Sequence, residues 1–290
     1  MQYEGDIYRP PSEAYSLIVQ VTVGCTHNKC TFCESYKAKK FRLKSYESIL
    51  ADLQEARSYY RYVQRVFFAD GDAMCMTTEK LLKLLDAVRD LFPECERVGV
   101  YSRAAQILKK SDEELEMLRN AGLGIVYIGA ESGSDEVLRR IDKGETSEQI
   151  IEAVQKAERA GIATSVTFIL GLGSKELMAE HAVKTGEMIS VMGASYVGLL
   201  TLLLSPEAPL YWDVQSGEFT LLTPQETVDE LEMIIEHTNC EKETVLRSNH
   251  ASNWLVLKGT LPTDKERFLR EIRSAKKDSS VLRPEMLRRL

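Results

Sequence analysis

Three closely spaced cysteines are the residues of this chain best suited to chemistry. Cys25, Cys30 and Cys33 have the spacing C-x4-C-x2-C and follow an apolar run at residues 16–23 that is typical of a strand. A loop at the end of a strand can bring three thiolates to one point. Three soft ligands and one vacant position suit an iron–sulfur cluster that binds a further molecule. The spacing therefore favours a cluster whose open iron is where chemistry can start.

Two other chemistries could use the same loop. Cys25, His27, Cys30 and Cys33 could supply a Cys3His zinc set, although His27 lies inside the tight loop and zinc fingers usually split their ligands into two distant pairs. Cys30 and Cys33 could also form a redox Cys-x-x-Cys pair. The iron–sulfur interpretation is favoured, and the other two remain open at this point.

The composition is that of a globular protein with a sizeable core. The chain has 290 residues, 44% of them hydrophobic and 28% charged, with a net charge of −7. No apolar run reaches membrane-spanning length, and residues 1–11 do not read as a secretory signal. We therefore expect a cytoplasmic protein in which Cys75, Cys95 and Cys240 are buried structural thiols. The negative charge argues against an extended nucleic-acid interface.

A basic run at residues 37–44 stands beside the cysteines. It could form the mouth of a site for an anionic substrate. Most charge runs are solvated surface loops, so we favour that interpretation.

Apolar runs alternate with amphipathic segments along residues 1–204, which predicts successive βα units. Six candidate strands lie at residues 16–23, 64–69, 97–102, 124–129, 163–170 and 195–203. Capping boxes at residues 111–114 and 146–149 predict two helix starts. Six such units form either an open doubly wound sheet or a partial barrel, and periodicity does not choose between them.

The pattern changes after residue 204. Residues 205–210 form a Pro-rich loop, and helices are expected near residues 223–237 and 263–277. We therefore divide the chain into a core at 1–204 and a helical extension at 205–290 that closes one side of the barrel.

The sequence from about residue 16 to 210 resembles the radical S-adenosylmethionine (SAM) superfamily. The resemblance implies a partial (β/α)6 barrel, with Cys25, Cys30 and Cys33 holding a 4Fe–4S cluster and SAM chelated to the fourth iron. An electron from the cluster would cleave SAM to a 5′-deoxyadenosyl radical that takes hydrogen from a substrate. Phe32 matches an aromatic residue near the adenine. The chain departs from the usual C-x3-C-x2-C spacing by one residue, which removes no ligand.

Further matches imply SAM contacts after the second and third strands. Residues 69–73 look like the family's Gly-Gly-Glu-Pro segment, with Gly71 and Asp72 at the positions that hold the SAM ammonium. Taken alone, Asp72 would be read as part of an ordinary Asp-Gly turn. Ser102 and Arg103 end the third strand, so they are candidates for the methionine half of SAM, with a surface arginine as the equal alternative.

Residues 128–138 resemble a segment shared by the coproporphyrinogen-dehydrogenase-like, methylthiotransferase and elongator-subunit branches. In those branches the residue at the position of Glu131 hydrogen-bonds the ribose, and the residue at the position of Lys143 faces the SAM carboxylate. Thr167, on the fifth strand, stands where some relatives have a ribose-binding aspartate.

Residues 247–254 form the densest polar and aromatic cluster outside the core. Asn249, His250 and Asn253 are candidate substrate contacts, and His250 is the candidate acid–base residue. An equally weighted alternative is a hydrogen-bonded turn that packs the tail onto the barrel.

The sequence thus predicts hydrogen abstraction from a small or modest-sized substrate, with a flavodoxin-like or ferredoxin-like electron donor as partner. Too few residues precede Cys25 for a cobalamin-binding domain, and there is no second cysteine set for an auxiliary cluster. An RNA-modifying radical SAM enzyme is an alternative, and a non-catalytic zinc protein is another. We expect neither a nucleic-acid partner nor membrane association.

Overall fold

The computed structural model describes residues 1–288 and divides the chain into two compact units. The first unit contains Met1–Asn28, Ser35–Ile128 and Lys156–Thr164. The second contains Lys29–Glu34, Gly129–Gln155 and Ser165–Leu290. Each unit is described by itself below. No helix in the described part of the chain is long and apolar enough to span a bilayer.

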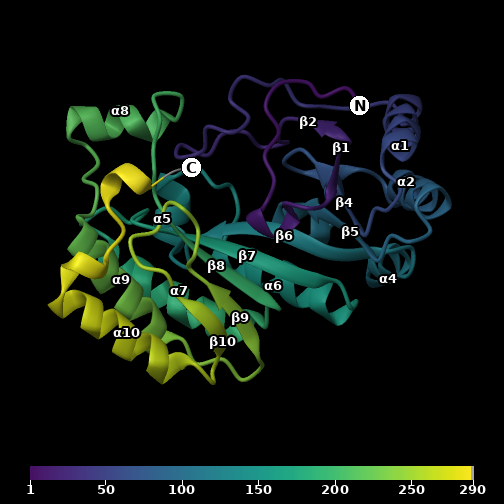
Figure 1. Cartoon of the computed structure of the whole chain (residues 1–290). Coiled ribbons are helices and arrows are strands. Elements are labelled where there is room, and N and C mark those ends of the chain that lie inside the picture. The colour runs from purple at the N-terminus through teal and green to yellow at the C-terminus, as the bar shows by residue number, and fades with distance from the viewer. Residues whose placement is uncertain (289–290) are drawn as a thin grey trace. The chain divides into compact units, whose positions relative to one another are not determined.

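A mostly parallel sheet is the central element of the fold. Its eight strands follow the order β1-β4-β5-β6-β7-β8-β9-β10. Their bounds are β1 Leu17–Gln20, β4 Arg65–Ala69, β5 Arg97–Tyr101, β6 Leu123–Glu131, β7 Ala163–Leu170, β8 Tyr196–Thr201, β9 Thr244–Arg247 and β10 Lys258–Leu261. A separate antiparallel pair joins β2 (Thr22–Val23) to β3 (Arg42–Leu43). Because β1, β4 and β5 are parallel in the first unit, their carboxyl ends share one edge (Figure 1).

All six predicted strands are present. The first is split into β1 and β2, because Thr22 and Val23 pair with β3 instead of continuing beside β4. The extension at residues 205–290 is not purely helical, since β9 runs parallel to β8 and β10 returns antiparallel to β9. Each strand has only four residues, which is too few to show the alternation of apolar and polar residues that predicts a strand.

Helices cover the strands of the first unit. They are α1 (Tyr46–Tyr59), α2 (Thr78–Leu91), α3 (Ala104–Leu108) and α4 (Asp112–Asn120). The predicted capping box starts α4, where Ser111 and Glu114 exchange side-chain and backbone hydrogen bonds. Inside the unit, Phe67, Tyr101 and Tyr127 meet edge to face with ring centroids 5.0–6.1 Å apart. This aromatic cluster packs the side chains of β4, β5 and β6 together on one face of the sheet.

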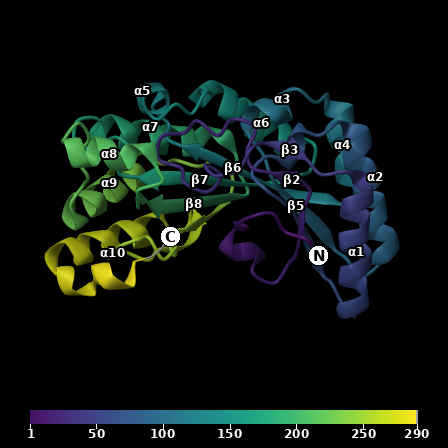
Figure 2. The same ribbon diagram turned by 90° about the horizontal axis from the view of Figure 1, so that it is seen from above.

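The second unit places helices beside β7 and β8. They are α5 (Asp135–Arg140), α6 (Ser147–Arg159), which ends in the first unit, α7 (Met178–Met192), α8 (Pro209–Ser216), α9 (Pro224–His237) and α10 (Lys265–Lys277). In Figure 2, α9 lies alongside α7 and α10 packs near α9. β7 alternates half-buried with buried residues, and Val166, Phe168 and Leu170 face the core.

The side chains of Lys39 and Lys44 in the basic run are largely buried, so the interpretation of residues 37–44 as a solvated loop is wrong for these two lysines. Lys39 lies 2.9 Å from Oδ2 of the buried Asp70, and that same oxygen accepts hydrogen bonds from Gly24 N and Gln20 Nε2. Lys44 lies 2.7 Å from Asp52. Lys39 and Lys44 therefore attach the loop after the cysteines to the sheet and to α1.

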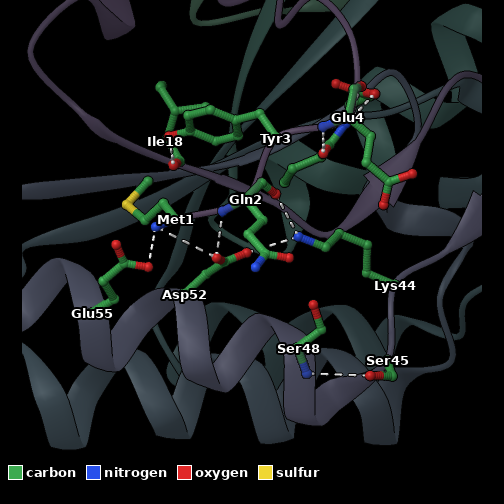
Figure 3. Close-up of polar contacts among 12 residues, drawn as sticks. Met1, Gln2, Tyr3, Glu4, Ile18, Lys44, Ser45, Ser48, Asp52 and Glu55 are labelled. Carbon is green, nitrogen blue, oxygen red and sulfur yellow. Dashed lines mark hydrogen bonds and ion pairs between the residues drawn. The ribbon is translucent and has the colours of Figure 1, made fainter.

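The Lys44–Asp52 ion pair also fastens the N-terminal segment (Figure 3). Asp52 Oδ1 accepts a 2.7 Å hydrogen bond from Gln2 N, and Lys44 Nζ donates to Gln2 O at 2.9 Å. The Tyr3 hydroxyl donates to Ile18 O at 2.7 Å. Gln2 is thus tied to the largely buried pair of Lys44 and Asp52, and Tyr3 is tied to β1.

We expect Lys44→Met to lower the free energy of unfolding by about 3 kcal/mol, because it leaves the Asp52 carboxylate buried without its cation. Urea unfolding followed by circular dichroism measures this. Lys40→Met, at an exposed position of the same run, is the matched control and should change little. Equal losses in the two variants would contradict a specific role for the buried pair.

Candidate active site

Cys25 belongs to the first unit, where it packs against the turn after β4. Gly71 N donates a 3.2 Å hydrogen bond to Gly24 O. A Cβ on Gly71 would lie 2.7 Å from Tyr36 Cε2 and 3.0 Å from Cys25 Cβ. Only glycine therefore allows the cysteine loop to approach this turn so closely.

Asp72 is fully buried and its carboxylate is held by groups within the first unit. One oxygen accepts a hydrogen bond from the Thr26 hydroxyl, and the other accepts from Arg103 N at 3.2 Å. The Ser102 hydroxyl donates to Arg103 O at 2.8 Å. The structure thus brings together the predicted residues Asp72, Ser102 and Arg103 beside the Cys25 loop. In this arrangement Asp72 joins the loop to the end of β5.

Cys30 and Cys33 belong to the second unit, on a turn held at both faces by backbone bonds. Cys33 N donates to Cys30 O at 3.3 Å. Thr31 N donates to Ile141 O, and Thr31 O accepts from Leu210 N, each at 2.9 Å. Phe32, between these anchors, is half-buried. The turn is therefore fixed to the end of α5 and the start of α8.

Glu131 and Lys143 form a buried ion pair in the second unit. Lys143 Nζ lies 3.3 Å from Glu131 Oε1 and 3.9 Å from Glu145 Oε2. A Cβ on Gly129 would lie 2.0 Å from Glu131 Oε1 and 3.4 Å from Lys143 Nζ, so the glycine leaves the space that the pair occupies. Glu131 itself has φ of 68°, a left-handed conformation that costs a non-glycine residue about 1–2 kcal/mol. Strain of this kind is typical of functional sites.

The charge of Lys143 is set by its surroundings. Burial acts to lower the pKa of Lys143, but attraction by Glu131, Cys30 and Glu145 raises it to about 12. A cationic lysine beside a cysteine and two carboxylates suits a ligand that carries both an amine and a carboxylate.

The turn that follows Glu131 is anchored to α7. Gly133 N donates a 3.0 Å hydrogen bond to Thr185 Oγ1, and the Ser132 hydroxyl lies 2.7 Å from His181 Nδ1. A Cβ on Gly133 would lie 2.2 Å from Lys184 O, which is backbone of the helix. The backbone of the turn therefore packs directly on the backbone of α7, and this contact fixes the position of the neighbouring Glu131.

A buried acid under the Gly171–Gly173 turn is a residue that sequence analysis missed. Glu230 Oε2 accepts a 2.6 Å hydrogen bond from Gly171 N, and Oε1 has no hydrogen-bond partner among residues 1–288. Burial raises the pKa of Glu230 to about 8 and lowers that of His181, 4.0 Å away, to about 4. Both groups are therefore neutral near pH 7. The only sequence signal was an acidic residue on the apolar face of α9.

The C-terminal polar cluster is held by hydrogen bonds to β8 and within its own turn. Asn253 is buried, and its amide donates to Leu199 O at 2.7 Å and accepts from Thr201 Oγ1 at 2.9 Å. His250 Nδ1 lies 2.9 Å from Ser252 Oγ, and burial lowers the pKa of His250. These contacts match the hydrogen-bonded turn that was the alternative to a substrate pocket. Asn249 is exposed.

Thr167 lies away from these contacts, at the middle of β7. It is paired in register with Gly198 of β8, and a Cβ on that glycine would lie 3.7 Å from Thr167 Oγ1. Because Gly198 has no side chain, it leaves space for about one methyl group next to the Thr167 hydroxyl.

The cysteine donors fit an iron–sulfur cluster by their chemistry. All six cysteines of the chain lie in the described region as thiols, and Cys25, Cys30 and Cys33 are partly exposed. Among residues 1–288, no three His, Cys, Asp or Glu side chains are gathered into a metal site. The donor set divides between the units, with one thiol in the first and two in the second. Soft thiolates with a cationic neighbour are the ligands that such clusters take.

Comparisons with known proteins agree with this chemistry. A family model described as the radical SAM superfamily matches residues 19–184. Among curated proteins, the chain is 27% identical over 172 residues to 4′-phospho-dehydrooxetanocin synthase of Priestia megaterium, covering 53% of this chain and 23% of that protein. It is 25% identical over 177 residues to a putative methylthiotransferase of Methanocaldococcus jannaschii, covering 57% and 37%. The chain thus spans less than half the length of these relatives.

Solved structures show the same fold. Coproporphyrinogen III oxidase of Escherichia coli, itself a radical SAM enzyme, superposes with a TM-score of 0.55 at 17% identity, covering 76% of this chain and 51% of that one. The relatives include the methylthiotransferase and coproporphyrinogen-oxidase types that the sequence resembles. The fold of this chain is therefore that of the TIM-barrel-like radical SAM enzymes. With more than half of its residues matched by the family model, the chain belongs to the radical SAM superfamily.

Proposed function

We propose that this protein is an enzyme that reductively cleaves SAM and uses the resulting radical to abstract hydrogen from a small or modest-sized substrate. The superfamily uses a 4Fe–4S cluster and SAM as cofactors. The observation that carries the proposal is the Glu131–Lys143 pair. It lies buried in the space left by Gly129, beside the turn that holds Cys30 and Cys33, within the segment matched by the family model.

The residues of this chain would bind and orient the two cofactors. Cys25, Cys30 and Cys33 would be the thiolate ligands of the cluster. Glu131 has a carboxylate that can accept hydrogen bonds from both hydroxyls of a ribose, and the Lys143 ammonium can pair with a carboxylate. Gly71, in the turn after β4, would offer backbone groups to an ammonium, and Phe32 would pack near a base.

When bound, the cofactors would supply one electron from the cluster and a 5′-deoxyadenosyl radical from SAM. The chain's contribution is position and exclusion of water, because Glu131, Lys143 and Asp72 are all buried. An electron donor of the flavodoxin or ferredoxin type would be the protein partner. With a net charge of −7, we expect no RNA substrate and no steep salt dependence of RNA binding.

Formation of 5′-deoxyadenosine by the anaerobically reconstituted, dithionite-reduced protein tests the proposal. We expect Cys30→Ala to reduce the product to background and to lower bound iron, because a cluster ligand is lost. Cys95→Ala is the matched control, since Cys95 lies outside the C-x4-C-x2-C loop and its thiol donates to Arg97 O at 3.4 Å. Zinc in place of iron, or unchanged product from Cys30→Ala, would refute the proposal.

A further inference from the structure

A cavity of about 570 Å³ lies within the second unit, at the carboxyl ends of β7 and β8. Leu170 and Thr201, the last residues of these strands, line its floor. The C-terminal extension supplies further walls, from α8, the segment that leads into α9, Trp254 and the tail after α10. The volume is in the range of small-molecule sites.

Leucines dominate the lining of this cavity, and all but Leu170 and Leu202 keep part of their surface exposed. Leu202, Leu203 and Leu204 follow β8, and Leu221 and Leu222 precede α9. Leu203, Leu204 and Leu222 are half-buried, and 43% of the surface of Leu221 is exposed. Apolar surface left open in a concave site favours a ligand that removes it from water, by about 25 cal/mol for each Å² covered.

The charged groups of the cavity neutralise each other. Among the lining residues, all of which lie in the described part of the chain, only Glu285 and Arg288 are charged, and they are 2.9 Å apart. Arg288 also donates to Ser252 O at 2.7 Å and stacks over the Trp254 ring at 4.0 Å. The Arg288 guanidinium therefore already has partners within the protein. Within residues 1–288, the lining has no other cation that could pair with a phosphate or carboxylate of a ligand.

The C-terminal tail holds the wall that carries Arg288. Arg283 Nη1 donates to three carbonyl oxygens, those of His250, Ala251 and Asn253, at 2.7–3.1 Å. In Figure 1 this tail, drawn in yellow, turns back from the end of α10. The wall is thus fixed by hydrogen bonds at both Arg283 and Arg288, and the cavity does not depend on a loose segment.

We propose that this cavity binds an uncharged, largely apolar small molecule. Tyr211 and Gln215, on α8, also line the cavity and carry groups that can form a hydrogen bond with such a molecule.

Two dyes with one aromatic skeleton test the proposal. N-phenylnaphthylamine is neutral, and anilinonaphthalene sulfonate carries an added anionic group. Dye binding to the full chain is measured by dye fluorescence and by quenching of Trp254 in a Trp212→Phe background, since Trp212 is 60% exposed and does not line the cavity. We expect the neutral dye to bind at least about tenfold more tightly than the anionic one. Equal affinities would overturn the proposal.

Variants locate the binding. Leu203→Glu and Leu222→Glu each place a charge on the lining at partly exposed positions, so the fold should tolerate them. We expect each to weaken binding of the neutral dye by about tenfold or more. Val191→Glu, at a residue of α7 that is 57% exposed and outside the cavity, is the matched control and should leave binding unchanged. Similar losses in all three, or in none, would overturn the assignment.

The dye assay requires neither iron nor SAM, so the two proposals fail separately. Protein that binds the neutral dye at the cavity but forms no 5′-deoxyadenosine would refute the radical reaction and leave the apolar site standing. Protein that forms 5′-deoxyadenosine but does not bind the dye would refute the apolar cavity alone.

Discussion

Gly133→Ala is expected to destabilise the second unit by about 3 kcal/mol or more and to reduce 5′-deoxyadenosine formation. The added Cβ would lie 2.2 Å from Lys184 O, 2.3 Å from Lys184 C and 2.6 Å from Thr185 N. These are backbone atoms of α7, so relief requires moving the helix or the Glu131–Ser134 turn, and overpacking of that kind is costly. Urea unfolding followed by tryptophan fluorescence measures the loss.

Gly198→Ala is the matched control. A Cβ at Gly198, in β8, would meet Leu200 Cδ1 and Thr167 Oγ1 at 3.7 Å, which is ordinary van der Waals contact. We expect a change within about 0.5 kcal/mol. If the two variants were equally stable, the close approach of the turn to α7 would not be a constraint on the fold.

Glu230→Gln is expected to change how stability depends on pH. The pKa of Glu230 is about 8 in the folded protein, above its ordinary value of 4.5, because burial disfavours the charged form. Its contribution to stability is therefore complete below pH 4.5 and is lost as the pH rises through 8. The loss proceeds at about 1.4 kcal/mol per pH unit, so it reaches several kcal/mol across the interval.

Glutamine keeps an acceptor for Gly171 N and does not titrate, so the variant should lack this decline. Urea unfolding between pH 5 and pH 9 gives the comparison, with Glu241→Gln, at an exposed position, as the control. His181 acts on the other side of the range. The pKa of His181 is lowered to about 4 from 6.5, so its contribution is present above pH 6.5 and is lost as the pH falls through 4. Parallel profiles for wild type and Glu230→Gln would rule out a buried neutral acid at this position.

The strands of the core could be predicted because each has a strong local signal. Residues 163–170 were predicted as a strand and are β7, and the capping box at Ser111 and Glu114 starts α4 as predicted. β9 and β10 could not be predicted, because a run of four residues shows no clear period. The pairing of β9 with β8 also joins residues that are far apart in the sequence.

Site residues divide in the same way. The family resemblance predicts separate SAM contacts for Glu131 and Lys143, which are twelve positions apart, and the structure pairs the two side chains at 3.3 Å. Glu230 could not be found, since its contact with Gly171 spans 59 positions and depends on how α9 packs. The Asn253 side chain is bonded to Leu199 O and to the Thr201 hydroxyl, both on β8, and this contact could not be predicted because the sequence does not say which side of a polar turn faces the core.

Redesign of this protein for solubility meets a restriction in the basic run at residues 37–44. In the sequence the lysines of this run look interchangeable. Lys39 and Lys44, however, form ion pairs with the buried carboxylates of Asp70 and Asp52. Lys40 is exposed and can be exchanged for an acidic residue, whereas the same exchange at position 39 would place two negative charges together beside Gly24, next to the first cysteine. Charge engineering near the cysteine loop should therefore be confined to positions such as Lys40.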